Sequence, residues 1–282
     1  MYGPGILVRS LSVPSITSKL TGLTWQYHRQ SDRHSKVACW GIIFDLLIMS
    51  KHIRDHISAG RIGFGINHTM INFVGDKKKD LDLVLCTPGN QNLGGKPQTL
   101  RSLVDLYAIT LTTHEADLLD QLPALSRVPV GNVLMALEAK AAMTEHRKAL
   151  PRLFDELNST YQTINGSSGE AIASAYLMVN ASESFVSPSR QHPLNPAPVV
   201  TVHEQPKAAE LAIGVAKTLP RRAGSGIPGY DAIGITVIDM VNDGSPVKLV
   251  STPPAPQAGD IYHYDNMIDR LAHTYATRFK HL

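Results

Sequence analysis

The chain has 282 residues, of which 43% are hydrophobic and 18% are charged, and its formal net charge is +3. This length fits one large domain or two small ones, and this hydrophobic fraction excludes a chain that is disordered throughout. A net charge so close to zero permits nucleic-acid binding through local patches but does not by itself predict it.

The cysteines and the apolar runs indicate the cellular compartment of the protein. Cys39 and Cys86 lie within apolar runs, so we expect buried free thiols in a reducing compartment and neither a disulfide framework nor a cysteine-based zinc site. Residues 1–10 do not form a signal peptide, because their apolar run is short and interrupted by a proline and an arginine. The longest apolar run, 37–49, is too short to span a bilayer. We therefore expect a cytoplasmic protein with no membrane segment.

In chain order, residues 1–33 contain two prolines and end in a polar stretch, and we expect an N-terminal arm with a short helix. Residues 34–57 have apolar positions at helical spacing on nearly all sides, which is typical of a buried helix. Asp45 is the exception in that helix. A buried aspartate needs either hydrogen-bond donors or a metal, and both interpretations remain open.

A hairpin follows. Residues 63–74 and 80–86 are apolar runs separated by a Gly-Asp-Lys-Lys sequence, which is typical of a tight turn. Lys77, Lys78 and Lys79 lie at the mouth of this hairpin. They would contact a phosphate backbone if nucleic acid binds there, or they form a solvated turn.

The middle of the chain alternates strands and helices. We expect a loop at 87–98, a helical insertion at 99–127, a strand at 133–140, a helix at 141–164 and a strand at 171–180. Arg147 and Lys148 lie on the polar face of the helix, where they would contact phosphates or only solvent.

The last third begins with a proline-rich loop. After this loop at 185–198 we expect a helix at 208–218, a hairpin at 232–241 and 246–250, and a closing helix at 262–279. The Gly-x-Gly-x-x-Gly match at 224–229 is not a dinucleotide-binding loop, because no strand precedes it and a proline lies inside it.

Charged residues stand two apart on two of the apolar strands: Asp80 and Asp82 on the first, Glu138 and Lys140 on the second. Residues i and i+2 of a strand share a face, so neighbouring strands would bring the acids and one ammonium together. Unbalanced charge in an apolar sheet is costly. The pattern predicts a site for a hard divalent cation with a lysine beside it, and the alternative is charged strand ends facing water.

An aspartate on one strand, a Glu-x-Lys closing a second strand and a long helix after it resemble the PD-(D/E)xK, restriction-endonuclease-like nucleases. The matching residues are Asp82, Glu138 and Lys140, although no proline precedes the aspartate. The resemblance covers residues 34–185 and implies an α/β fold with an αβββαβ core, a mixed central sheet and flanking helices. Residues 186–282 would form a C-terminal extension of the same domain.

The resemblance also implies an activity. It implies a Mg²⁺-dependent endonuclease that hydrolyses DNA, expected to be double-stranded, of a restriction or anti-phage defence type. Mg²⁺, or Mn²⁺ in its place, would be held by Asp82, Glu138 and the backbone carbonyl of Ala139, with Asp80 or Asp45 supporting a second ion.

In that scheme Lys140 would orient and help deprotonate the attacking water and stabilise the developing charge. Because cutting two strands needs two sites, we expect a homodimer or a higher oligomer. Two alternatives remain: a non-catalytic nucleic-acid-binding or assembly protein with the same fold, and a phage or bacterial structural subunit in which Glu-Ala-Lys occurs by chance.

Overall fold

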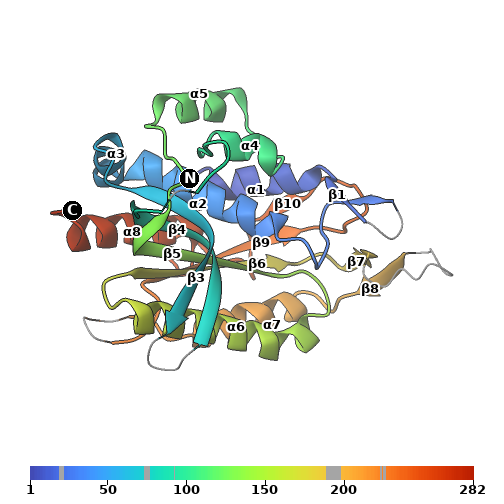
Figure 1. The fold of residues 1–282 in the computed structure, drawn as a ribbon. Coiled ribbons are helices and arrows are strands. Elements are labelled where there is room, and N and C mark those ends of the chain that lie inside the picture. The colour runs from blue at the N-terminus through green and yellow to red at the C-terminus, as the bar shows by residue number, and fades with distance from the viewer. Residues whose placement is uncertain (19–21, 73–76, 92, 189–197, 223, 225–226) are drawn as a thin grey trace.

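The structure is a computed structural model that describes residues 1–282 except 19–21, 73–76, 92, 189–197, 223 and 225–226. The described residues form a mixed α/β fold in which a six-stranded central sheet is covered by helices on both faces (Figure 1). The expected α/β class, with a mixed sheet flanked by helices, is confirmed. The loop expected at 185–198 is wrong at its start, because residues 185–187 pair with residues 199–201 as a strand, and residues 189–197 lie outside the described residues. The glycine-rich match at 224–229 also lies partly outside the described residues.

The sheet contains β3 (Gly63–Asn72), β4 (Lys77–Pro88), β5 (Val130–Ala142), β6 (Ile172–Asn180), β9 (Ala232–Asp239) and β10 (Lys248–Val250). Their spatial order is β10-β9-β6-β5-β4-β3. The pairs β3–β4, β4–β5 and β9–β10 are antiparallel, and β5–β6 and β6–β9 are parallel. Every residue of β6 is buried, which explains its nearly continuous apolar sequence.

One face of the sheet is covered by α1 (Gly3–Ser12), α2 (Arg33–Met49) and α8 (Tyr264–Arg278), with α3 (Lys51–Ser58) following α2. The segment expected as an N-terminal arm contributes α1, whose Ile6, Leu7 and Leu11 are buried in the same core cluster as α2. Two short helices, α4 (Ser102–Leu106) and α5 (Thr113–Gln121), lie beyond this layer (Figure 1).

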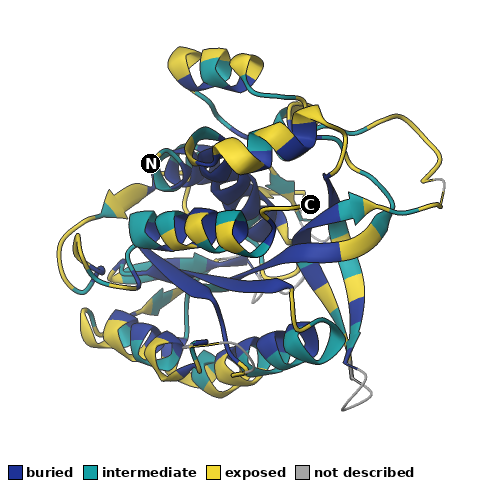
Figure 2. Cartoon of the chain, turned by 90° about the vertical axis from the view of Figure 1, so that its left-hand side faces the viewer, coloured by how far each residue is buried: buried dark blue, intermediate teal, exposed yellow. Residues whose placement is uncertain are grey.

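The opposite face is covered by α6 (His146–Ser167) and α7 (Lys207–Thr218). Figure 2 shows the buried sheet between helices that are exposed on their outer sides. Each helical layer therefore packs its own half of the core against the sheet, and the site described below lies at the edge between the two halves.

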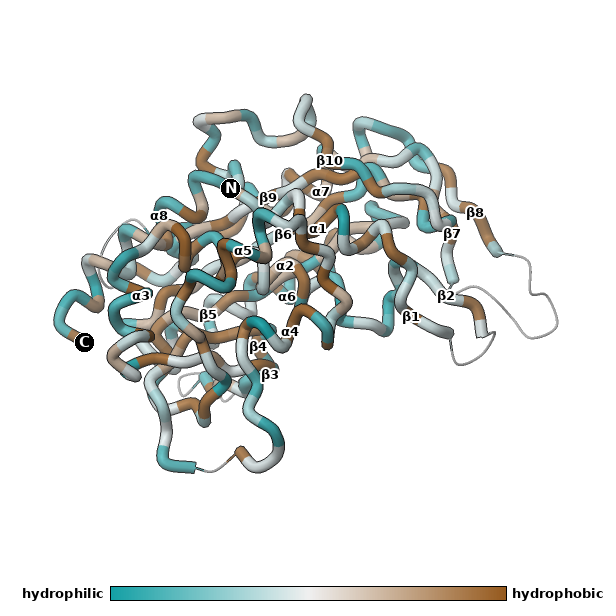
Figure 3. The backbone as a smooth tube through the Cα atoms, turned by 90° about the horizontal axis from the view of Figure 1, so that it is seen from above, coloured by the Kyte–Doolittle hydropathy of each residue, from teal (hydrophilic) through white to brown (hydrophobic). Residues whose placement is uncertain are grey.

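Two small ribbons complete the fold. They are β1 (Ile16–Thr17) with β2 (Thr24–Trp25), and β7 (Ser184–Ser187) with β8 (Val199–Val202). Seen from above, both ribbons lie at one end of the molecule and α3 lies at the other (Figure 3). None of the described helices combines the length and the apolar character that crossing a bilayer requires.

Three helical predictions are wrong in extent. The helix expected at 34–57 is divided at Ser50, whose extended backbone ends α2 and whose side chain caps α3 by accepting from the N–H of Ile53. The insertion at 99–127 is helical only in α4 and α5. The helix expected from 141 begins at His146, because β5 keeps its pairing with β6 as far as Ala142.

Candidate functional site

The candidate site lies where β4 separates from β5. The two strands are neighbours, as predicted, but they pair only from Leu83 of β4 to its end at Pro88. The part of β4 before Leu83 stays paired with β3 and turns toward α6, where the amine of Lys79 lies 3.5 Å from the carbonyl oxygen of Glu156. The strands thus form a fork just beyond the Leu83–Leu137 pair, and Asp82 and Glu138 are the next residues along each arm.

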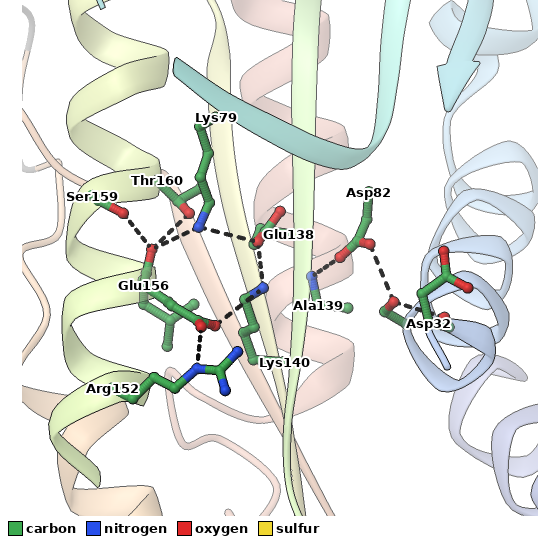
Figure 4. A network of polar contacts seen from close by, with 12 residues as sticks. Asp32, Lys79, Asp82, Glu138, Ala139, Lys140, Arg152, Glu156, Ser159 and Thr160 are labelled. Carbon is green, nitrogen blue, oxygen red and sulfur yellow. Dashed lines mark hydrogen bonds and ion pairs between the residues drawn. The ribbon is translucent and has the colours of Figure 1, made fainter. Parts of the chain in front are cut away.

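Asp82 lies on the α2 side of the fork. Its Oδ2 accepts a hydrogen bond of 3.0 Å from the N–H of Ala139. This side-chain oxygen takes the place of the main-chain carbonyl that would accept from that N–H if the two strands were still paired. Its Oδ1 accepts from the Ser35 hydroxyl at 3.1 Å and lies 3.2 Å from the amine of Lys36, both on α2. Figure 4 shows this carboxylate and Glu138 on opposite sides of β5.

Lys36 donates hydrogen bonds to several oxygens on the α2 side of the fork. Its side chain is only 3% exposed; besides the Asp82 carboxylate, its amine donates to the Asp82 carbonyl at 3.1 Å and to the side-chain oxygen of Asn67. Asn67 has a positive φ of 51°, and the β3–β4 register skips the Asn67–Asp82 pair. The buried ammonium therefore satisfies oxygens that a local break in the ladder leaves free.

Glu138 and Lys140 lie on the α6 side. The Glu138 side chain is 2% exposed, and its Oε1 lies 2.8 Å from the Lys140 amine and 3.9 Å from the Lys79 amine. Lys140 also lies 3.4 Å from the carboxylate of Glu156, which in turn accepts from Arg152. The second oxygen, Oε2 of Glu138, is buried and has no hydrogen-bond partner within the described part of the chain.

Burial and neighbouring charges set the ionisation of this cluster. Burial, reinforced by the negative charge of Asp82, raises the pKa of Glu138. Burial opposes the charged form of Lys140, but the adjacent Glu138 carboxylate outweighs it, and the net effect raises the pKa of Lys140. The pKa of Glu156 is lowered, because contact with Arg152 and Lys140 outweighs the effect of burial. Lys140 is therefore an ammonium at neutral pH.

The other predicted ligands lie elsewhere. Asp80 is exposed and accepts a hydrogen bond from the Thr69 hydroxyl on β3, so it does not share a partner with Asp82. Asp45 lies three helical turns along α2 from Ser35 and accepts from the N–H groups of Tyr2 and Gly3 and from the Tyr264 hydroxyl. The interpretation of Asp45 as an aspartate satisfied by protein donors matches these contacts.

Of the predicted phosphate-binding residues, only Lys79 belongs to the cluster. Lys78 is exposed, and the side chain of Lys77 lies outside the described residues. Arg147 and Lys148 point away into solvent at the start of α6, where their side chains are 64% and 78% exposed and pair with Glu204 and Glu145.

Sequence reasoning missed Lys36 and Glu156, and it placed Arg152 only on the basic face of the helix, without its acidic partner. Lys36 carried a signal, because it is a lysine near the start of an otherwise apolar helix. Glu156 and Arg152 carried a weaker one, the i,i+4 spacing of opposite charges one turn apart.

A pocket of about 350 Å³ opens beside the fork. It is lined by Asp82 of β4, by Ala139 and Lys140 of β5, and by residues of segment 27–35 and of α6. Burial lowers the pKa of His34, another lining residue, to about 4, so its imidazole is neutral at neutral pH.

Comparison of the chain with family models, with curated proteins and with solved structures found no match.

Among the residues that the structure describes, the fork offers some, but not all, of the ligands that a divalent cation needs. In its favour is the orphaned, buried Oε2 of Glu138, a hard anionic donor of the type that Mg²⁺ binds. Against it, no group of three or more His, Cys, Asp or Glu side chains in the described residues is arranged to hold a metal. Glu138 could therefore supply one ligand through Oε2. The carboxylate of Asp82 lies on the other side of β5 (Figure 4) and already accepts from Ala139, Ser35 and Lys36, so it would reach the same ion only by leaving these donors.

Proposed function

We propose that the protein is a metal-dependent hydrolase of phosphodiester bonds in nucleic acid, with its active site at the β4–β5 fork. The observation that carries this proposal is Glu138: a buried carboxylate with one unpartnered oxygen, 2.8 Å from Lys140 and beside the peptide N–H that Asp82 binds. A buried charge in that state is expensive unless a cation completes its coordination.

The topology supports the same proposal. The order α2, β3, β4, β5, α6, β6, with three antiparallel strands followed by a parallel one, matches the αβββαβ core implied by the resemblance. The match covers more of the chain than the short Glu-x-Lys motif and does not depend on it.

Each residue of the fork would have a separate role. Glu138 would hold Mg²⁺, and Asp82 would join it once its carboxylate leaves the Ala139 N–H. The ion would neutralise a phosphate oxygen and lower the pKa of bound water. Lys140 is kept charged by its carboxylate neighbours, so it would stabilise negative charge on the phosphate and orient water rather than accept a proton. Glu156, held by Arg152, would keep the Lys140 amine near the reacting centre.

A non-catalytic nucleic-acid-binding protein with the same fold is the second candidate. One observation favours it: Lys36 already neutralises Asp82, and Lys140 already neutralises Glu138. A fork whose charges are balanced by its own lysines does not require a metal.

Incubation with plasmid DNA and with single-stranded DNA, in the presence of Mg²⁺ or Mn²⁺, tests the proposal. We expect wild-type cleavage that chelation abolishes and that Glu138→Gln and Lys140→Ala reduce by about a hundredfold or more. Lys51→Ala, which removes an exposed lysine of α3 away from the fork, is the matched control and should cleave normally. Wild-type protein that binds these substrates without cutting them supports the second candidate, and unchanged cleavage by Glu138→Gln moves the active site elsewhere.

A further inference from the structure

The pocket beside the fork has the size and lining of a site for one nucleotide. Its volume of about 350 Å³ is at the lower end for small-molecule sites. A space of this size holds one nucleotide rather than a stretch of double helix. A nucleotide whose base enters the pocket must therefore be unpaired.

Two rings line the pocket, those of Tyr27 and His34, and their centroids lie 4.9 Å apart. The Tyr27 ring also lies 6.0 Å from that of Phe185, which is outside the pocket lining. Burial lowers the pKa of His34 to about 4 and raises that of Tyr27, so both rings are uncharged at neutral pH. Stacking on aromatic rings is how proteins hold unpaired bases without reading their sequence.

The backbone of Tyr27 is fixed in position from a distant part of the chain. Asn242, which is 1% exposed, accepts from the Tyr27 N–H at 2.9 Å and donates to the Tyr27 carbonyl at 3.1 Å. It also donates to the Val186 carbonyl at 2.8 Å. These bonds hold a loop residue in place before any ligand arrives, and such preorganisation reduces the entropic cost of binding.

Charged side chains of both signs line the pocket: Arg29, Lys140 and Arg152 are basic, and Asp32, Asp82 and Glu156 are acidic. Arg29 is exposed and makes no ion pair within the described residues, and the Arg152 side chain is 84% exposed although its Nε donates to Glu156. Guanidinium groups bind phosphate oxygens in a bidentate manner. Their place at the mouth suits the phosphates that flank a base held inside.

We propose that this pocket binds one unpaired nucleotide, with its base against Tyr27 and its phosphates at Arg29 and Arg152, so that the substrate is single-stranded nucleic acid or a single-stranded end. This rests on the proposed function only in placing the bound strand at the fork. It replaces the sequence-based expectation of a double-stranded substrate.

The test measures binding separately from cleavage. Fluorescence anisotropy of a labelled oligodeoxythymidine, in the presence of a chelator, is compared with that of the same strand annealed to its complement. We expect the single strand to bind about tenfold or more tightly than the duplex. Charge alone would predict the opposite order, because the duplex has the higher charge density. Equal or tighter binding of the duplex overturns the proposal. An oligouridine arm tells whether DNA or RNA is preferred.

Variants locate the contact. Tyr27→Ala should weaken binding of the single strand by about 5- to 150-fold, the usual effect of removing one stacking ring, while Tyr27→Phe and Tyr27→Trp should bind like wild type. Tyr2→Ala is the matched control, because Tyr2 is also half-buried with two aromatic neighbours but does not line the pocket. Wild-type affinity in Tyr27→Ala, or an equal loss in Tyr2→Ala, overturns the proposal.

Arg29→Ala removes only an exposed side chain, so misfolding does not complicate its interpretation. It should reduce the slope of log K against log salt by about 0.7, the value for one phosphate contact on a single strand, and an unchanged slope overturns the role of Arg29. If the strand binds as expected but is never cut, the pocket stands and the hydrolase proposal fails. If cutting occurs without dependence on Tyr27, the reverse holds.

Discussion

The carboxylate of Asp82 accepts a hydrogen bond of 3.0 Å from the N–H of Ala139, across the gap between β4 and β5. This one contact closes the sheet on the α2 side of the fork, while Glu138, the residue before Ala139, turns its own carboxylate toward α6. The sequence predicts that Asp82 and Glu138 share one site, but β5, which carries Glu138, lies between the two carboxylates (Figure 4).

Removing the charge of Asp82 should destabilise the fold. Asp82→Asn leaves the buried ammonium of Lys36 with only Asp32 as a counter-charge, an exposed carboxylate 3.7 Å away, and we expect the free energy of unfolding to fall by about 3 kcal/mol in urea titrations. The double variant Asp82→Asn/Lys36→Met should recover most of this loss, because no unpaired charge remains. Asp55→Asn breaks an exposed pair and should cost about 0.5 kcal/mol or less. Equal losses in Asp82→Asn and Asp55→Asn would contradict this assignment.

Cation binding can be measured without any substrate. If Glu138 and Asp82 hold a divalent ion, Mn²⁺ or Mg²⁺ at about a hundred times its Kd should stabilise the wild type by about 2.7 kcal/mol. Glu138→Gln should abolish this shift in thermal unfolding, because it removes the charge and keeps the shape. Glu204→Gln, at an exposed position, should keep it. A wild type that shows no metal-dependent shift would leave the fork as a structural ion-pair cluster.

Asp45 should matter for stability alone. Asp45→Ala removes the acceptor for the N–H groups of Tyr2 and Gly3 at the start of α1 and for the Tyr264 hydroxyl. We expect a loss of about 2–4 kcal/mol in chemical denaturation. Asp45→Asn, which keeps an acceptor, should lose less. Metal binding measured by calorimetry should be unchanged in both variants, and a loss of metal affinity in Asp45→Asn would restore the second-metal interpretation.

Acidification should weaken the fold through His146. Burial, helped by His203, lowers the pKa of His146 from 6.5 to about 4. Between these values the unfolded chain binds a proton that the folded protein does not, so stability is complete above about pH 6.5 and falls as the pH decreases toward 4.

We expect the contribution of His146 at about pH 5 to be a loss of about 2 kcal/mol. The measurement is urea unfolding at about pH 7 and pH 5 for the wild type and for His146→Gln, which does not titrate in this range. An equally steep pH dependence in His146→Gln would assign the effect to other groups. An NMR titration of the His146 ring checks the lowered pKa directly.

Much of the fold followed from the sequence. The period-two runs at Asp80–Cys86 and Val133–Lys140 identified two strands of the sheet, and their neighbouring placement is confirmed. The strand at 171–180 and the closing helix were also confirmed to within two residues at each end. Apolar periodicity encodes these elements because each must bury one face or both.

The limits of the helices depended on contacts that periodicity does not record. The division of α2 from α3 depends on the backbone and side chain of Ser50, and the end of β5 depends on how far β6 continues beside it. A hydrophobic pattern gives the face of a helix but not the residue where a cap or a neighbouring strand stops it.

The sequence by itself determined which residues could carry charge into the sheet: Asp82, Glu138 and Lys140, on strands that had to be buried. Only the tertiary structure decided which partners they have, because the break opposite Asn67 and the turn of the hairpin toward α6 set the direction of each side chain. The same holds for the pocket, since Tyr27 is positioned by Asn242, 215 residues away in the chain. Strand periodicity assigns a side chain to a face only while the strand stays regular, and here the strand bends at the residue on which the site depends.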